Sequence, residues 1–168
     1  MAKSLLSARK VPHPRHVHNQ LRDLSVRILV VNDSEQFRQL VSVILAMRPD
    51  LQVVGEASDG SEAVRKADEL KPDLIILDID LPNVNGIEAA RQIRRCAPQS
   101  KIILLSPESA AEFVQEALSF GAWGYILKMN IGTELLVAVE AVLLGQQFVS
   151  KEFSADEYAS LTRFVFAS

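Results

Sequence analysis

Short apolar runs, rich in Ile, Val and Leu, alternate along this chain with segments of helical periodicity. The runs lie at residues 26–31, 51–57, 74–78, 101–105 and 122–127. Runs of this kind, separated by helical patterns, are typical of buried parallel strands. Each connection between parallel strands must be right-handed and must cover the sheet with a helix. The alternation therefore predicts a doubly wound α/β fold around a five-stranded parallel sheet, written (βα)5.

The helices expected between these strands have recognisable ends. Asp59 followed by Glu62, and Ser109 followed by Glu112, each form the pattern of a capping box. Gly145 is expected to end the last helix, because glycine accepts the left-handed conformation found there. The 23 residues that follow Gly145 could hold a short strand and a weak helix. The expected helices cover residues 34–47, 59 onward, 86–96, 109–120 and 131–144.

Polar residues suited to phosphate chemistry follow four of the strands. They are Asn32 with Asp33, then Asp78, Ser106 and Lys128. In an open parallel α/β sheet, ligands bind beyond the carboxyl ends of the strands, so we expect these side chains to converge. A carboxylate can attack phosphorus, and both Mg²⁺ and an ammonium group can offset the repulsion between the two anions. The pattern predicts a phosphoryl site assisted by Mg²⁺.

The composition is that of one globular domain. The chain has 168 residues, of which 48% are hydrophobic and 23% charged, and no apolar stretch approaches the ~18 residues of a membrane span. The single cysteine, Cys96, excludes an internal disulfide and favours a cytoplasmic location. Residues 1–25 carry five basic residues against one acidic residue, together with all three histidines. We expect them to form a disordered extension that contacts nucleic acid weakly at most.

Taken together, the motifs resemble the response regulator receiver domain of two-component signalling. The resemblance covers residues 26 to about 144, and it implies a flavodoxin-like fold with strand order 2-1-3-4-5. It places a receiver domain at residues 26–145 and a tail with a possible short helix at 146–168. The sequences at residues 121–128 and 144–150 are similar to those of regulators with a LuxR-type helix-turn-helix output. The matching strings are ILVVND at 28–33, PDLIILDIDLP at 72–82 with Gly86, KIILLS at 101–106 and GAWGYILK at 121–128.

The resemblance also implies roles for the residues at the strand ends. Asp78 would accept a phosphoryl group from a sensor histidine kinase, and Lys128 would contact that group. Mg²⁺ would bind Asp33, Asp78 and the backbone carbonyl of Asp80, while Asn32 would reach the ion through a water molecule. The chain would catalyse only its own phosphorylation and dephosphorylation, so it is not expected to be an enzyme.

A switch is implied at the other two strands. Ser106 would donate a hydrogen bond to the phosphoryl group, and Tyr125 would turn inward when Ser106 moves. Trp123 and Tyr125 are two positions apart on the fifth expected strand, so we expect both on the same side of the sheet. The surface around Trp123 and Tyr125 would then bind an output partner or a second copy of the chain.

Two departures from the family pattern open alternatives. Asn32 stands where the family usually has a second acid, so Mg²⁺ should bind more weakly, although Asp80 could offset part of the loss. This substitution motivates a second hypothesis, a phosphorylation-independent receiver that acts as an interaction module. The residues after Gly145 are too few for a helix-turn-helix domain. The chain is then either a single-domain regulator or one whose output domain has been lost or cut away.

A third hypothesis is a phosphatase of the haloacid dehalogenase type. Asp78 would be its nucleophile and Asp80 its acid/base, with Ser106 and Lys128 as later motifs. That family expects an acidic pair after the lysine, and the next expected helix supplies only Glu134 and Glu140. The chain order therefore favours the receiver.

Overall fold

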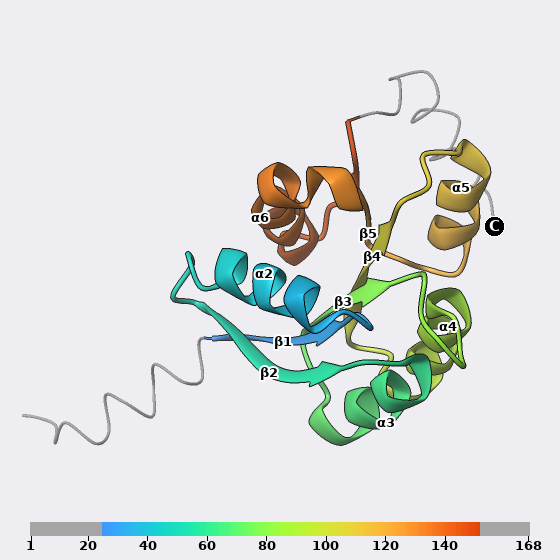
Figure 1. Ribbon diagram of the computed structural model, residues 1–168, viewed down its shortest axis with the longest axis horizontal. Coiled ribbons are helices and arrows are strands. Elements are labelled where there is room, and N and C mark those ends of the chain that lie inside the picture. The colour runs from blue at the N-terminus through green and yellow to red at the C-terminus, as the bar shows by residue number, and fades with distance from the viewer. Residues whose placement is uncertain (1–24, 152–168) are drawn as a thin grey trace, which may run out of the picture.

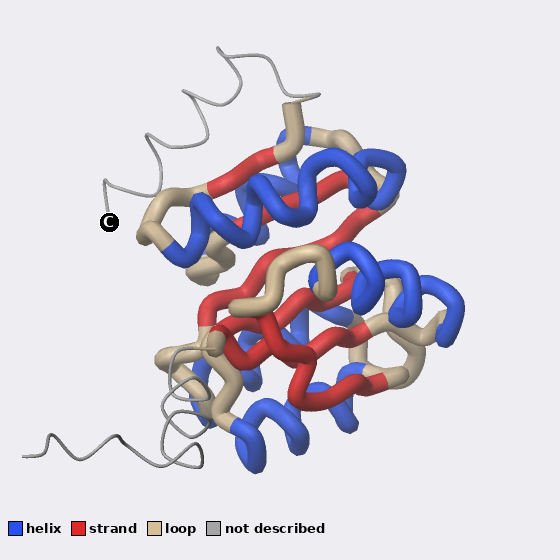
Figure 2. The backbone as a smooth tube through the Cα atoms, turned by 90° about the vertical axis from the view of Figure 1, so that its left-hand side faces the viewer, coloured by secondary structure: helices blue, strands red, loops and turns tan. Residues whose placement is uncertain are grey.

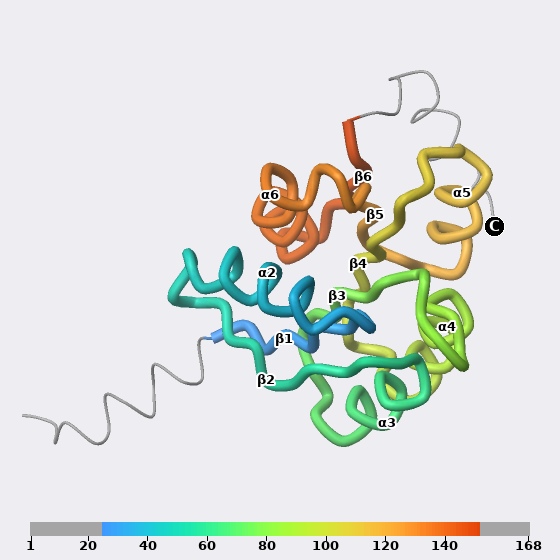
Figure 3. Tube along the Cα trace, viewed as in Figure 1, coloured from blue at the N-terminus to red at the C-terminus, as the bar shows by residue number. Residues whose placement is uncertain are grey.

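A parallel sheet of six strands lies at the centre of the computed structural model, which describes residues 25–151 (Figures 1 and 2). The strand order is β2-β1-β3-β4-β5-β6, and Figure 3 shows β1 between β2 and β3. This confirms the doubly wound α/β fold and the order 2-1-3-4-5, and it adds a sixth strand parallel to β5. The strands are β1 Val26–Val31, β2 Leu51–Ala57, β3 Leu74–Asp78, β4 Lys101–Ser106, β5 Gly124–Leu127 and β6 Phe148–Val149.

Helices cover both faces of the sheet. Helices α2 and α6 lie on one face, and α3, α4 and α5 lie on the other (Figure 1). Neighbouring residues of one strand enter different cores: Ile28 packs on the α2 side, while Leu29 packs on the opposite side. Because both faces are buried in the middle of the sheet, the central residues of β1, β3, β4 and β5 are apolar in succession instead of alternating with polar residues. The helices are α2 Glu35–Leu45, α3 Gly60–Leu70, α4 Gly86–Cys96, α5 Ala111–Ser119 and α6 Ile131–Leu143, with the short 3₁₀ helix η1 Lys128–Asn130 before α6.

Of the two expected capping boxes, the one at Asp59 forms its cap, but its return bond goes to Ser58, the residue before the cap. The Asp59 carboxylate accepts a hydrogen bond of 2.8 Å from the backbone N–H of Glu62 and so caps α3. The Glu62 carboxylate reaches back to the backbone N–H of Ser58, at 2.9 Å. The box expected at Ser109 was wrong, because α5 begins at Ala111 after Ala110 and has no side-chain cap.

Contacts inside the loop before α5 explain its late start. The backbone N–H of Glu108 donates to the Ser106 hydroxyl, and the carbonyl of Glu108 accepts from the Tyr125 hydroxyl. These two bonds hold the backbone beyond β4 in a loop conformation, so the helix cannot begin at Ser109.

The packed unit extends beyond the expected boundary at Gly145. Gly145 has a φ of 79° and ends α6, as predicted. The chain then returns to the sheet as β6, and Ser150 is buried. The extension at residues 1–24 and the weak helix expected after residue 151 lie outside the described residues. Within residues 25–151, no helix is long and apolar enough to cross a membrane.

Trp123 and Tyr125 lie on opposite sides of the sheet, so the expected shared face was wrong. Tyr125 belongs to the core under α3, α4 and α5, whereas Trp123 packs against the core under α2 and α6. The expected fifth strand began at Ala122, but β5 begins at Gly124. Trp123 therefore precedes the extended segment in which side chains alternate. Its ring lies 4.4 Å from the ammonium group of Lys101.

Candidate functional site

The carboxylate of Asp78 is the centre of the candidate site. Asp78 is the last residue of β3, and its side chain is fully buried. The ammonium group of Lys128, at the end of β5, lies 2.8 Å from Asp78 Oδ2. Burial raises the pKa of Asp78 above its usual value, and the hydrogen bond and charge of Lys128 oppose that rise. Residues 50 positions apart in the chain thus form one ion pair, as expected for strand ends that share an edge.

Asn32 contacts the same carboxylate directly. Its side-chain Nδ2 donates a hydrogen bond of 2.5 Å to Asp78 Oδ2, and its Oδ1 accepts from the backbone N–H of Ser34 at 2.8 Å. The two partners fix the orientation of the amide, because a flipped side chain would face a carboxylate with its oxygen and an N–H with its amino group. Asn32 thus stabilises the Asp78 carboxylate by a direct hydrogen bond, and its expected contact with a metal-bound water stays a prediction.

The loop after β3 shapes the backbone around Asp78. The backbone N–H of Asp80 donates to Asp78 Oδ1 at 3.0 Å, and the backbone N–H of Gly86 donates to the carbonyl of Ile79 at 2.9 Å. A Cβ atom at Gly86 would lie 2.0 Å from the carbonyl oxygen of Asp78, so no other residue fits without moving the loop. The Asn85 side chain then caps α4.

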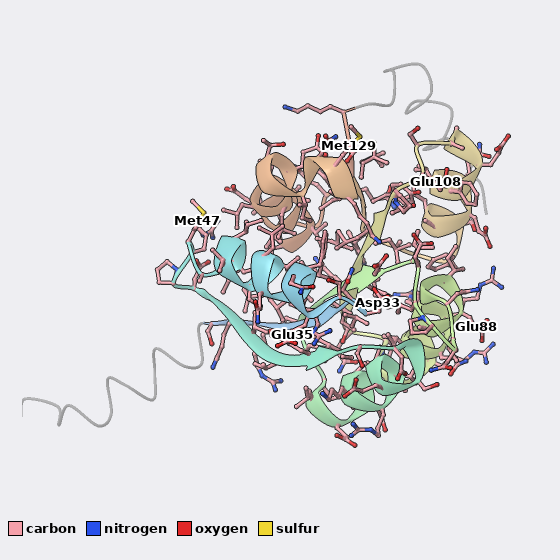
Figure 4. All side chains as sticks on the ribbon, viewed as in Figure 1. Asp33, Glu35, Met47, Glu88, Glu108 and Met129 are labelled. Carbon is pink, nitrogen blue, oxygen red and sulfur yellow. The ribbon has the colours of Figure 1, made fainter. Side chains whose placement is uncertain are left out.

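Two exposed acids flank the buried one. Asp33 follows the end of β1 and is exposed (Figure 4), and the Asp80 side chain is 60% exposed and 3.8 Å from the ammonium group of Lys128. Carboxylate and carbonyl oxygens are the ligands that Mg²⁺ prefers, and the ion keeps several waters, so Asp33, Asp78 and Asp80 fit it chemically. Within residues 25–151, no three acids, histidines or cysteines are already gathered at metal-binding distances.

Ser106 and Tyr125 lie beside the site, inside the protein. The Ser106 side chain is buried, and the Tyr125 ring is fully buried with its hydroxyl donating to the Glu108 carbonyl at 2.8 Å. Burial raises the pKa of Tyr125, and the neighbouring Ser106 hydroxyl opposes this effect. Tyr125 already points inward, so a movement from the surface to the interior is not needed for this ring to contact Ser106.

Sequence reasoning missed the contact between Glu134 and Ser150. Glu134, in the first turns of α6, is buried, and its carboxylate accepts hydrogen bonds from the hydroxyl of Ser150 and the backbone N–H of Lys151. Ser150 belongs to the segment after α6, and no sequence motif ties it to a glutamate 16 positions earlier. Because Glu134 is occupied in this way and Glu140 is exposed, they do not form the acidic pair that a phosphatase would need.

Comparisons with known proteins agree with this geometry. Residues 28–140 match the family described as the response regulator receiver domain. The chain is 35% identical over 133 residues to the transcriptional regulatory protein DegU of Brevibacillus brevis, covering 79% of this chain and 56% of DegU. It is 39% identical over 121 residues to the transcriptional regulatory protein LiaR of Bacillus subtilis, covering 72% and 57%. The chain thus spans less than two thirds of the length of these relatives.

Two solved structures are also similar. The response regulator domain of Thermotoga maritima CheB has a TM-score of 0.67 and 40% identity, covering 71% of this chain and 97% of that one. A LuxR-family two-component response regulator from Aurantimonas sp. SI85-9A1 has a TM-score of 0.72 and 32% identity, covering 83% and 97%. Both likenesses extend over almost the whole of the compared chain.

Proposed function

Because the chain belongs to the response regulator receiver family, we propose that Asp78 is the residue that accepts a phosphoryl group from a sensor histidine kinase. The observation that carries this proposal is the buried Asp78 carboxylate held between the ammonium group of Lys128 and the amide of Asn32. Burial without a positive partner would favour the protonated acid, which is a poor nucleophile. The ammonium group of Lys128 opposes the effect of burial on the pKa of Asp78 and so favours the ionised carboxylate.

The proposed step forms a bond between a carboxylate oxygen of Asp78 and phosphorus. The bond from phosphorus to the donor breaks, and its electron pair leaves with the donor, the histidine imidazole in the case of a kinase. Lys128 then contacts a phosphoryl oxygen, and the Ser106 hydroxyl donates to another. When bound by Asp33, Asp78 and the Asp80 carbonyl, Mg²⁺ would supply the charge compensation that two approaching anions need.

Intact mass measurement tests the proposal. Incubation of the full chain with acetyl phosphate and Mg²⁺ should raise its mass by one phosphoryl group, and addition of EDTA should prevent the rise. The Asp78→Asn variant should show no rise, because its amide is not a nucleophile toward phosphorus. An equal rise in that variant would place the modification elsewhere.

An unchanged mass in the wild type would instead support the second hypothesis, a phosphorylation-independent interaction module. The Asn32–Asp78 hydrogen bond favours that hypothesis, because it satisfies the carboxylate without a metal ion. The same experiment therefore decides between the two functions.

We further propose that the signal is read in the cytoplasm by an output partner or by a second copy of the chain. DegU and LiaR are named as transcriptional regulatory proteins, which supports an output in transcription. Since Tyr125 contacts the loop before α5, we place the responding surface at that loop and not at Trp123. Sedimentation with and without beryllofluoride and Mg²⁺ tests for assembly, and an Asp78→Asn control should not respond.

A further inference from the structure

A buried hydrogen-bonded cluster joins the segment after β6 to the end of β5. The hydroxyl of Ser150 donates to the carboxylate of Glu134 and accepts a hydrogen bond of 2.9 Å from the backbone N–H of Leu127. The backbone N–H of Lys151 donates to the other Glu134 oxygen at 3.2 Å. Glu134 and Ser150 are 5% and 1% exposed, so these contacts form inside the protein. We call Glu134 and Ser150 the clasp.

Leu127 connects the clasp to the candidate site, because it directly precedes Lys128 in the chain. Leu127 is the last residue of β5, and the next residue is Lys128, whose ammonium group pairs with Asp78. The Leu127 N–H belongs to the peptide group that joins Ile126 to Leu127, one residue before Lys128, and it donates to the Ser150 hydroxyl. A bond that holds this peptide group restrains the backbone from which Lys128 extends.

We propose that Glu134 and Ser150 are positioning residues for Lys128, and that they couple the chain leaving the sheet at Lys151 to the reactivity of Asp78. This inference rests on the proposed role of Lys128 as the partner of the phosphoryl group. Neither clasp residue touches Asp78. They act through one peptide group, and the segment that follows β6 becomes part of the phosphorylation machinery.

Each partner in the clasp depends on the other. A serine hydroxyl has one hydrogen, and because Ser150 gives it to Glu134, a lone pair of the same oxygen faces the Leu127 N–H. A buried carboxylate needs its donors, since burial of a charge without partners is costly. Its place near the N-terminus of α6 also suits a negative charge. Loss of Ser150 would leave both Glu134 and the Leu127 N–H short of a partner.

The chain offers a matched control for this test. Ser100 is also 1% exposed, and its hydroxyl donates to the carbonyl of Pro72 at 2.6 Å, just before β4 and so at the opposite edge of the sheet from Asp78. Ser100→Ala and Ser150→Ala each delete one buried hydroxyl. If Ser150 only stabilises the fold, both variants should lower the free energy of unfolding and neither should change the rate at which Asp78 is phosphorylated.

The experiment measures the rate of Asp78 phosphorylation by acetyl phosphate in saturating Mg²⁺ for the full-length chain. We expect Ser150→Ala to slow this rate by about tenfold, since small misplacements of a positioning group cost between ~10-fold and ~100-fold. Ser100→Ala should match the wild type. Ser150→Thr, which keeps the hydroxyl, should recover most of the rate, and Glu134→Gln should fall between, because its amide can accept from only one of the two donors. Equal rates for Ser150→Ala and Ser100→Ala would overturn the proposal.

A second readout does not depend on phosphorylation. Hydrogen exchange of the Leu127 amide should become faster in Ser150→Ala and stay unchanged in Ser100→Ala. If the wild type is not phosphorylated at all, the proposed function fails while this exchange measurement still decides whether the clasp exists. If the wild type is phosphorylated and Leu127 exchange is the same in both variants, the clasp fails while the proposed function stands.

Discussion

The side-chain amide of Asn32 donates a hydrogen bond to the carboxylate of Asp78 inside the candidate site. An aspartate at position 32 could not make this contact, because an ionised carboxylate only accepts hydrogen bonds. It would instead place a second negative charge beside Asp78, which is already buried. In the unmodified chain the amide of Asn32 therefore stabilises the Asp78 carboxylate through a hydrogen bond. An aspartate at position 32 would need a metal ion to relieve its repulsion with Asp78.

The Asn32→Asp variant should be less stable than the wild type in EDTA and should bind Mg²⁺ more tightly. Loss of a hydrogen bond to a charged group and addition of a like charge should lower the free energy of unfolding by about 2 kcal/mol. A divalent ion relieves that repulsion, so the deficit should shrink as Mg²⁺ is added. Urea unfolding across a Mg²⁺ titration measures both effects. Asn32→Ala is the control, which should lose stability without gaining affinity, and equal or weaker Mg²⁺ binding by the Asp variant contradicts the argument.

Gly86→Ala should damage both the fold and the site. The new Cβ atom would lie 2.0 Å from the Asp78 carbonyl oxygen and 2.6 Å from the Ile79 Cα, so the loop must move. We expect a loss of about 3 kcal/mol in unfolding free energy, as for other overpacked positions, together with slower phosphorylation of Asp78. Gly132→Ala is the control, because no atom outside its chain neighbours and its own helix backbone lies within 4 Å of the new Cβ. In helix α6 it should stabilise the protein by about 0.5–1 kcal/mol. Equal unfolding free energies of the two variants would show that the loop after β3 can move to accommodate the new Cβ at little cost.

Tyr125→Phe should loosen the loop before α5 while Asp78 stays reactive. The variant loses the hydrogen bond from the Tyr125 hydroxyl to the Glu108 carbonyl, which costs about 1 kcal/mol of unfolding free energy. Hydrogen exchange at residues 107–110 should become faster, and phosphorylation of Asp78 by acetyl phosphate should continue. Unchanged hydrogen exchange at residues 107–110 would show that Tyr125 does not control the proposed switch surface.

Glu62 should make the stability of the fold depend on acid pH. Its hydrogen bond with Lys66, together with one from the backbone N–H of Ser58, lowers the pKa of Glu62 from 4.5 to about 2. A lowered pKa in the folded state means that the stabilisation is present above pH 4.5 and is lost as the pH falls towards 2. Glu62→Gln should therefore be less stable than the wild type at pH 7, and the difference should close near pH 2, as measured by urea unfolding.

Glu69→Gln is the matched control for that prediction. Its ion pair with Arg65 lies on the same helix, but both side chains are more than half exposed. Exposed ion pairs contribute little to stability, so this variant should have about the same free energy of unfolding as the wild type at every pH. A pH-dependent loss as large as that of Glu62→Gln would assign the effect to general surface charge.

The sequence alone determined the architecture and the centre of the site. An unbroken apolar run such as residues 74–77 is expected where both faces of a strand are buried, and that condition requires helices on both sides of a parallel sheet. Strand ends in such a sheet share one edge, so Asp78 and Lys128 could be placed together although they are far apart in the chain. These conclusions follow from the hydrophobic periodicity of the strands and helices, which can be read from short stretches of the sequence.

Only the tertiary structure decided which partner each polar group takes. The side of the sheet that receives Trp123 depends on where β5 begins, and the start of α5 depends on the contacts of Glu108 with Ser106 and Tyr125. The link from Glu134 through Ser150 to Leu127 joins segments that no local pattern relates. A hydrogen bond forms where a donor and an acceptor meet within about 3 Å, and the positions of groups from distant segments are set by the packing of the whole core.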